Sequence, residues 1–178
     1  FHVSARTVST HALNIFGDHS DVMACRQTGF AMLCEGNVQE VMDLSPVAHL
    51  AALSGKVPFI NFFDGFRTSH EIQKIAVWDY KDLADMCDMD AVKAFREHAL
   101  NPEHPAMRGS HENGDTFFQH REACNQYYDA LPEVVEKYMG KINEKLGTDY
   151  KLFNYYGAPD ADRVIIAMGS INDVAEEV

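Results

Sequence analysis

The chain has 178 residues, of which 46% are hydrophobic and 24% are charged, and its formal net charge is -12. This length and composition are enough to bury a sizeable core, which excludes a disordered or fibrous protein and favours one domain, with or without a partial second. The acidic balance argues against a nucleic-acid-binding surface, because phosphate binding needs a basic footprint.

Short apolar runs alternate with helical stretches along the chain. This rhythm is typical of βα units and predicts an α/β fold with a mostly parallel sheet flanked by helices. The predicted principal strands are residues 1–5, 29–33, 57–63 and 164–168. The first strand has no leading turn and the last helix has no stop signal, so we expect the chain to be a piece of a longer polypeptide.

Helix signals follow the second predicted strand. Asn37 with Glu40 three residues later is a capping pattern, and it predicts a helix that runs to Ser54. Pro46 leaves two alternatives, since it either kinks one helix or occupies the first turn of a second one.

The middle of the chain has weaker signals. A further short strand is predicted at 72–77, and one or two helices at 79–100, with Asp88 or Asp90 able to cap the second. Prolines and glycines at 101–114 predict a loop long enough to form an arm or a lid.

Helix is predicted again at 115–146, with a break or restart at Pro132 and a stop at Gly147. A turn-rich connector then precedes the last predicted strand. We therefore predict two domains, 1–160 and the truncated start of a second α/β domain at 161–178.

Arg6 directly follows the first predicted strand and is the leading candidate for a substrate-binding residue. Ligands of parallel sheets bind at the carboxyl ends of strands, and a guanidinium offers a fixed fork of donors that suits a carboxylate. A structural ion pair with Asp18 or Asp21 is the alternative. His19 and Asp21 are predicted to line a cleft or an interface beside Arg6.

A second polar cluster, residues 64–71, follows the third predicted strand. Arg67 and His70 could line a cleft or a subunit contact there. The alternative is a capped turn, in which Thr68 or Ser69 covers the start of a helix.

Other site chemistry finds little support in the sequence. The nine histidines lack metal-binding spacing, and we expect no catalytic metal ligand in this segment. The four cysteines include no Cys-x-x-Cys pair and are expected to be free thiols. Residues 168–170 could present backbone N–H groups to an anion or form an ordinary βα turn. No apolar stretch approaches the roughly 20 residues that span a bilayer, so we expect a cytoplasmic protein without a membrane partner.

Five sequence blocks resemble pyruvate:ferredoxin (flavodoxin) oxidoreductase. They are HVSAR at 2–6, FGDHSD at 16–21, RQTGFA at 26–31, FFDGFRTSHE at 62–71 and YGAPDA at 156–161. The resemblance extends over the whole chain, and it implies the later part of that enzyme's first domain and the opening of its second. The implied fold of the first domain is like the pyrimidine-binding domain of thiamine enzymes.

The resemblance implies that the full-length protein oxidatively decarboxylates pyruvate on thiamine diphosphate and transfers the acetyl group to coenzyme A. It also implies Mg²⁺, 4Fe-4S clusters, ferredoxin or flavodoxin as electron acceptor, and a homodimer. Arg6 matches the family's arginine that contacts the pyruvate carboxylate, where it would orient the substrate.

Other parts of the family's machinery are implied to lie outside this segment. The acid that activates the aminopyrimidine is expected before Phe1, the diphosphate and Mg²⁺ site after Val178, and the cluster cysteines elsewhere, so the fragment alone is expected to be inactive. Two alternatives remain: a related 2-oxoacid:ferredoxin oxidoreductase, or a non-catalytic segment that serves packing and dimer contacts.

Overall fold

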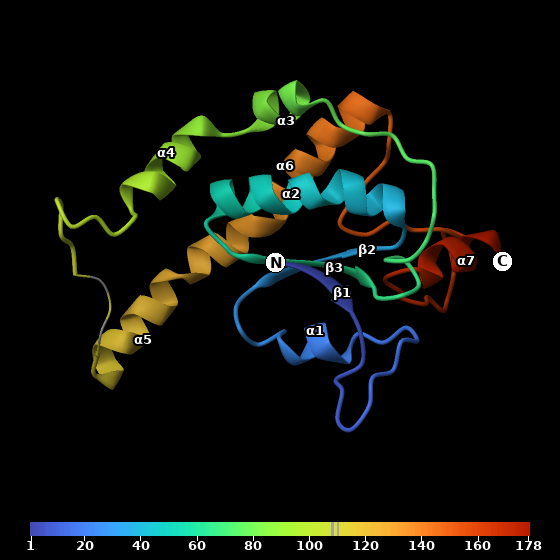
Figure 1. Cartoon of the computed structure of the whole chain (residues 1–178), viewed down its shortest axis with the longest axis horizontal. Coiled ribbons are helices and arrows are strands. Elements are labelled where there is room, and N and C mark those ends of the chain that lie inside the picture. Colours follow the sequence, from blue (N-terminus) through green and yellow to red (C-terminus); the bar gives the residue numbers. More distant parts are fainter. Residues whose placement is uncertain (108, 110) are drawn as a thin grey trace.

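The computed structural model describes residues 1–107, 109 and 111–178. Its elements are, in order, β1 (His2–Ala5), α1 (Ser20–Ala24), β2 (Ala31–Glu35), α2 (Val38–Gly55), β3 (Phe59–Asp64), α3 (Tyr80–Met86), α4 (Met89–Glu97), α5 (Gly114–Ala123), α6 (Asn125–Leu146) and α7 (Ile171–Glu177). The three strands form one parallel sheet in the order β1-β3-β2 (Figure 1). The predicted α/β fold with a parallel sheet between helices is confirmed.

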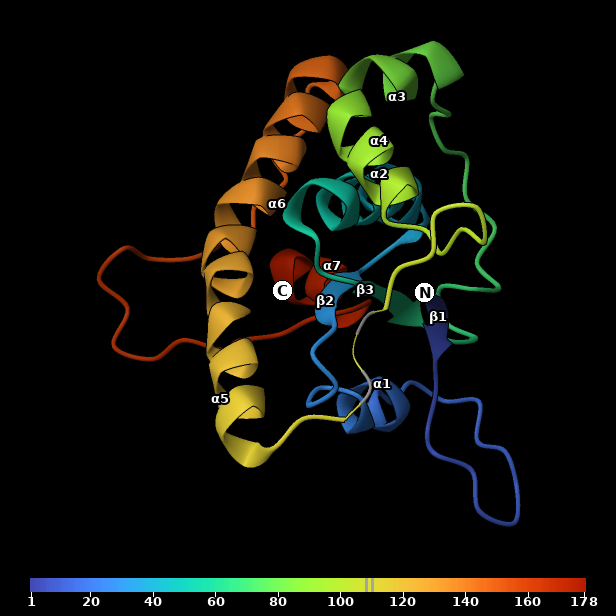
Figure 2. The same ribbon diagram turned by 90° about the vertical axis from the view of Figure 1, so that its left-hand side faces the viewer.

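The sheet separates two apolar layers (Figures 1 and 2). On one face, α2 and α6 pack together over Phe59 and bury the larger cluster, in which Ile142 and Tyr138 are almost fully enclosed. On the other face, Val22 of the short α1 packs with Phe62 and its neighbours. The alternation of side chains along each strand explains how the same three strands serve both layers.

Helix α2 is continuous through Pro46, so the alternative of a second helix is excluded. The Asn37 side chain accepts a hydrogen bond from the Glu40 N–H at 2.9 Å, as the capping pattern predicts. Pro46 has no N–H to offer the carbonyl of Met42 one turn earlier, and the Trp78 indole N–H donates to that carbonyl instead, at 3.2 Å. This substitute bond removes part of the cost of a proline inside the helix.

The strand predicted at 72–77 is wrong, because this segment is an irregular strap beside α2. Its Ala76 N–H donates to the Gln39 side chain at 2.8 Å, and the Gln39 amide donates back to the Ala76 carbonyl at 3.3 Å. The backbone hydrogen bonds that Ala76 would form with a neighbouring strand are therefore made with a helix side chain.

In the second half of the chain, α4 begins after its predicted cap residue, whereas α6 does not break at its proline. Asp88 caps α4 by accepting from Ala91 N–H at 2.9 Å. The predicted break at Pro132 is wrong, because α6 runs through it and the interruption lies at Cys124. There the backbone bonds span three residues, from Cys124 to Arg121, which tightens the turn between α5 and α6.

The loop predicted at 101–114 is irregular in its described residues up to Asn113, and positions 108 and 110 lie outside the described residues. Residues 164–168 form no strand with any part of the described chain, so that prediction is also wrong. An apolar run becomes a strand only where another strand lies beside it, and Ile165 and Ile166 here are 92% and 85% exposed. The division at residue 161 stays a prediction.

Within the described residues, none of the helices combines the length and the apolar character that crossing a membrane requires.

Candidate substrate-binding site

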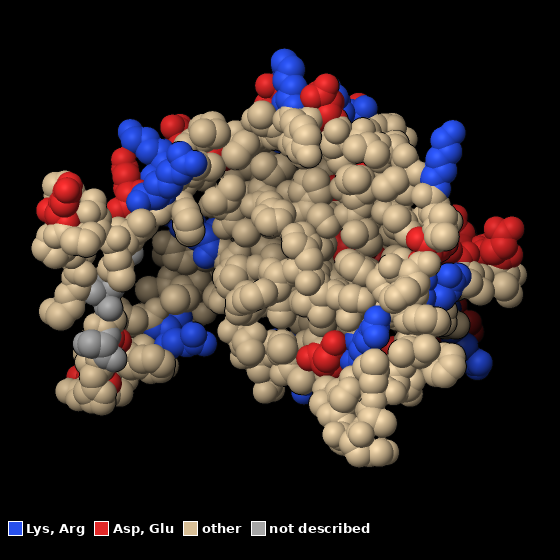
Figure 3. Space-filling view, in the orientation of Figure 1, with Lys and Arg blue, Asp and Glu red and all other residues tan. Residues whose placement is uncertain are grey.

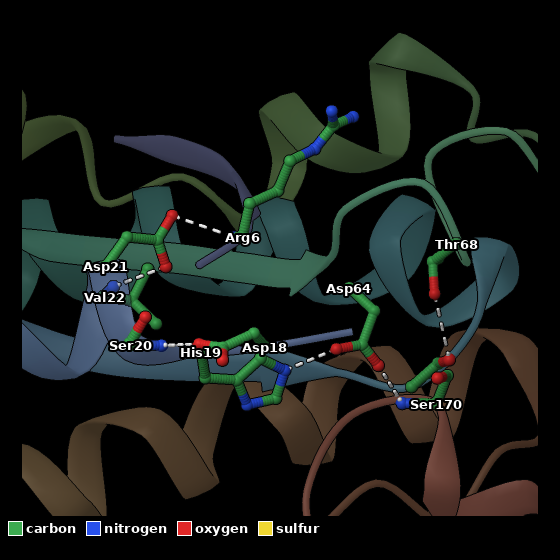
Figure 4. A network of polar contacts seen from close by, with 10 residues as sticks. Arg6, Asp18, His19, Ser20, Asp21, Val22, Asp64, Thr68 and Ser170 are labelled. Carbon is green, nitrogen blue, oxygen red and sulfur yellow. Dashed lines mark hydrogen bonds and ion pairs between the residues drawn. The ribbon is translucent and has the colours of Figure 1, made fainter. Parts of the chain in front are cut away.

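Arg6 lies just beyond the carboxyl end of β1, and its main chain is held in place. Its backbone N–H donates to the Asp21 carboxylate at 2.9 Å. The guanidinium points away from Asp21, His19 and Asp64 (Figure 4). Within the described part of the chain, Arg6 forms no ion pair, so the structural pair with Asp18 or Asp21 is not what this geometry contains.

Asp18 serves its own turn. It accepts a hydrogen bond from Ser20 N–H at 2.6 Å. The Ser20 side chain first, and then this backbone bond, hold the pKa of the Asp18 carboxyl below its usual range. The bond shapes the entry to α1, which in turn presents Asp21 to the Arg6 backbone. Asp21 is thus a structural support of the Arg6 main chain.

Two buried polar atoms lie on the α2 face of the sheet near the same edge. Ser4 and Glu35 flank Phe63 in the strand register, so the three side chains share one face. Within the described chain, the Ser4 hydroxyl oxygen and one carboxyl oxygen of Glu35 have no hydrogen-bond partner. Unsatisfied buried polar atoms are uncommon, and they fit a place where a polar ligand approaches.

Glu35 is completely buried, and its other oxygen accepts a hydrogen bond from the Asn61 amide. Burial, followed by the nearby charge of Glu40, raises the pKa of the Glu35 carboxyl to about 9. The carboxyl is therefore neutral near pH 7, and it can donate a hydrogen bond as well as accept one. The sequence signal for this group is an acidic residue directly after the apolar run of β2, a position not among the predicted site residues.

His19 and Asp64 form a second polar centre, on the opposite face of the sheet from Glu35. His19 Nε2 lies 2.5 Å from Asp64 Oδ1, and the other Asp64 oxygen accepts from Ser170 N–H at 2.6 Å (Figure 4). Burial opposes ionisation of Asp64, but the hydrogen bonds from Ser170 and His19 outweigh it and lower the pKa of the carboxyl. The contact joins the end of β3 to the start of α7.

The contact with Asp64 bears on the two alternatives for residues 168–170, an anion site or an ordinary βα turn. The Ser170 N–H at the start of α7 donates to the Asp64 carboxylate of the same chain. In this structure the turn therefore forms an intramolecular contact with β3. Gly169 has a φ of +83°, and a Cβ there would lie 2.8 Å from an Asp64 oxygen. The close approach of Asp64 therefore depends on glycine.

Arg67 and His70 lie apart from both polar centres, in the exposed turn after β3. Arg67 pairs with Glu71 at 3.6 Å, and the His70 ring contacts the Ser69 hydroxyl at 2.9 Å. The alternative helix start is also absent from this described turn, where Ser69 Oγ instead accepts from the Phe66 N–H at 2.8 Å. The structure thus separates the predicted site residues into different surroundings.

A groove of about 760 Å³ lies between α2 and the strap that follows β3. Its walls are mainly apolar, with Met42 and Trp78 on two sides and the His2–His49 pair at one end. Few charged side chains appear over the middle of this face of the molecule (Figure 3). Arg6 is not among the groove's lining residues, so the groove and the candidate carboxylate site are different places.

Metal-ligating groups do not converge in the described residues, where no three His, Cys, Asp or Glu side chains are placed to hold an ion. The four cysteines are free thiols, as expected from their spacing.

Comparison with known proteins adds the family. The family described as "Pyruvate flavodoxin/ferredoxin oxidoreductase, thiamine diP-bdg" matches residues 1–140. The pyruvate-flavodoxin oxidoreductase of Klebsiella pneumoniae is 62% identical over the whole chain, and the pyruvate:ferredoxin oxidoreductase of Moorella thermoacetica is 61% identical over 99% of it. A pyruvate dehydrogenase [NADP(+)] of Cryptosporidium parvum is 49% identical over the whole chain.

The chain spans 15% of the length of the first two of these relatives and 9% of the third. The similarity covers this segment almost from end to end and includes all five sequence blocks. The chain therefore belongs to the pyruvate flavodoxin/ferredoxin oxidoreductase family, in its thiamine diphosphate-binding region.

Proposed function

We propose that the full-length protein is a thiamine diphosphate-dependent pyruvate:ferredoxin or flavodoxin oxidoreductase and that this segment contributes Arg6 to bind the substrate carboxylate. The observation that carries the proposal is the guanidinium itself. It stands at the carboxyl end of a parallel strand, half-buried and free of any ion pair within the described residues. A partly desolvated cation without a protein counter-ion is suited to an anionic ligand.

The task of Arg6 is orientation. Two parallel N–H···O bonds fix the plane of a carboxylate, and they also fix the direction of the ketone carbon attached to it. Thiamine diphosphate, when bound, supplies the nucleophilic carbon and the electron sink for decarboxylation. The unpartnered Ser4 hydroxyl and the neutral Glu35 carboxyl fit a polar ligand at this edge of the sheet.

The remaining components belong to other parts of the full-length protein in this proposal. They are Mg²⁺, the 4Fe-4S clusters, the coenzyme A site and the homodimer contacts. The relatives' printed names differ in acceptor, naming flavodoxin, ferredoxin or NADP(+), although this segment is shared by all three. The acceptor is therefore determined outside this segment, and all three names agree on pyruvate.

The test is substitution of Arg6 in the full-length protein, with pyruvate turnover and pyruvate binding as measurements. Arg6→Ala removes the only group proposed to hold the carboxylate. We expect kcat/KM for pyruvate to fall, with a loss of about 2 to 5 kcal/mol of transition-state stabilisation. Arg6→Lys keeps the positive charge and loses the forked pair of N–H donors. Its activity is therefore expected to lie between those of the wild type and Arg6→Ala.

A second candidate is a segment that serves only packing and subunit contacts. Exposed aromatic side chains of α4 and α5 favour it, since Phe95 and Phe118 are 70% and 65% exposed. The Arg6 experiment separates the two functions: an unchanged KM and kcat for pyruvate in Arg6→Ala would leave only the packing role.

A further inference from the structure

The turn after β3 brings a glycine against the candidate arginine. In the sheet, Ala5 of β1 is the register partner of Asp64 of β3. One further hydrogen bond continues the pairing past the strand ends, from Gly65 N–H to the Ala5 carbonyl at 2.8 Å. Arg6 and Gly65 are therefore neighbours immediately beyond the paired strands.

Gly65 leaves space that the Arg6 side chain uses. A Cβ at position 65 would lie 2.4 Å from the Ala5 carbonyl oxygen, 2.6 Å from Arg6 Cγ and 2.7 Å from Arg6 Nε. Cβ atoms of folded proteins essentially never lie this close to atoms to which they are not bonded. Gly65 does not have the positive φ that marks other glycines of this chain, so space and not backbone conformation is what requires glycine here.

The main chains on both sides of this contact are anchored. The Arg6 N–H is bound by Asp21 at 2.9 Å. In the turn, the N–H groups of Thr68 and Ser69 both donate to the Asp64 carbonyl, at 3.0 Å and 3.3 Å, and Phe66 already adopts a left-handed φ of +66°. A side chain at position 65 would meet the Ala5 carbonyl oxygen and the Arg6 stem together. With both backbones held, the stem is the more movable of the two and would be displaced, while the contact with the carbonyl oxygen would strain the end of the β1–β3 pairing.

We propose that Gly65 is a positioning residue for Arg6, whose missing side chain lets the guanidinium lie across the end of β3 in the direction that receives the substrate carboxylate. This inference rests on the proposed function of Arg6. It adds that the direction of the Arg6 side chain depends on a residue that does not itself touch the substrate.

The test is Gly65→Ala in the full-length protein. We expect kcat/KM for pyruvate to fall about 10-fold to 100-fold, which is the usual cost of moving an orienting group by an ångström. Equilibrium binding of oxamate, a non-reacting pyruvate isostere, should weaken in the same variant. Gly55→Ala is the matched control, because its Cβ would lie 2.9 Å from Leu131 Cδ1, in the helical layer, and crowd no part of Arg6.

A double-substitution cycle separates positioning from general disruption. Arg6→Ala removes Cγ and Nε, which are two of the three atoms that a Cβ at position 65 would meet. If Gly65 acts through Arg6, Gly65→Ala changes kcat/KM less than 2-fold when Arg6 is already alanine, and it lowers the unfolding temperature less in that background.

The outcomes are distinct. An Arg6→Ala protein with unchanged pyruvate kinetics overturns the proposed function, whatever position 65 does. Weakened kinetics in Arg6→Ala together with wild-type kinetics in Gly65→Ala overturn only the positioning role. Gly65→Ala could instead lower kcat/KM by the same factor in the wild type and in Arg6→Ala, or prevent folding in both. Either result would mean that Gly65 serves the Ala5 backbone contact, and it would also overturn the positioning role.

Discussion

The packed layer of α2, α6 and the sheet contrasts with the arm formed by residues 89–123. Helices of both regions have recognisable sequence signals, including an Asn or Asp cap at α2 and α4. Seven residues of α2 and four of α6 are buried, whereas α4 and α5, which lie within the described residues, contain none. Local signals therefore form a helix in either place, but burial needs a partner face from elsewhere in the chain.

In the arm, the described helices form from local sequence signals without burying residues against another part of the chain. An i,i+4 pair of Lys93 with Glu97 at 3.9 Å adds to the Asp88 cap of α4. Such exposed pairs contribute only about 0.3 to 0.5 kcal/mol each. The aromatic side chains of the arm add nothing here, because they face solvent in this segment. The comparison predicts that substitutions cost much in the packed layer and little in the arm.

The largest expected difference is between Ile142→Ala and Phe118→Ala. Ile142 is fully buried between α6 and α2, so its truncation should cost about 2 to 5 kcal/mol of unfolding free energy. Phe118, in the arm, should cost less than about 0.5 kcal/mol. Urea unfolding of the 178-residue chain measures both. Comparable costs for the two variants would remove the distinction between the regions, and a larger Phe118 cost in the full-length protein would show that another part of that protein covers the arm.

The packed layer was more predictable from the sequence than the candidate site. The apolar runs at 1–5, 29–33 and 57–63 correspond to β1, β2 and β3, because each is a short apolar run that lies beside a parallel neighbour. The identical pattern at 164–168 failed for lack of a neighbour among the described residues. A strand forms only when it pairs with a neighbouring strand, so the sequence of one segment alone cannot specify it.

The candidate site divides in the same way. The place of Arg6 directly after a strand was predictable, since it follows an apolar run and matches a family motif, and its role in binding stays a prediction. The support from Asp21 to the Arg6 main chain and the space left by Gly65 were not, because both depend on the register between segments far apart in sequence. Sequence spacing suggested Asp21 as an ion-pair partner, and only the geometry shows that its carboxylate binds the backbone.

The packed layer contains an ionisable group that opposes its stability, and pH gives the next largest effect. The folded state raises the pKa of Glu35 to about 9, above its usual value of 4.5. The folded protein therefore holds a proton that the unfolded chain releases, and stability falls as pH rises between these two values, by at most about 1.4 kcal/mol per pH unit.

Glu35→Gln should remove this dependence. We expect the variant to match the wild type at pH 5 and to be more stable by roughly 1 to 3 kcal/mol at pH 7. Amide hydrogen exchange of β2 and β3 across that pH range measures the difference. The exposed Glu103 of the arm supplies the control as Glu103→Gln, and an unaltered pH profile in Glu35→Gln would show that Glu35 is ionised in the folded state.

The smallest effect, and the finest comparison of the two regions, comes from their helix caps. Asn37 in α2 and Asp88 in α4 each accept one backbone N–H at 2.9 Å, from Glu40 and Ala91. Replacing either cap by alanine should cost its own helix about 1 kcal/mol. In α2 the loss should appear in global unfolding, because this helix cannot fray without opening the core. In α4 it should appear only as faster local hydrogen exchange.

Serine variants make the cap comparison specific. Asn37 also donates to Asp173 at 3.2 Å, a contact that alanine and serine both lose, whereas serine keeps a capping oxygen. The stability difference between Asn37→Ser and Asn37→Ala therefore isolates the cap, and Asp88→Ser against Asp88→Ala does the same in the arm. Equal global losses from the two caps would mean that α4 unfolds together with the core, which would make the arm part of the same cooperative unit as the sheet.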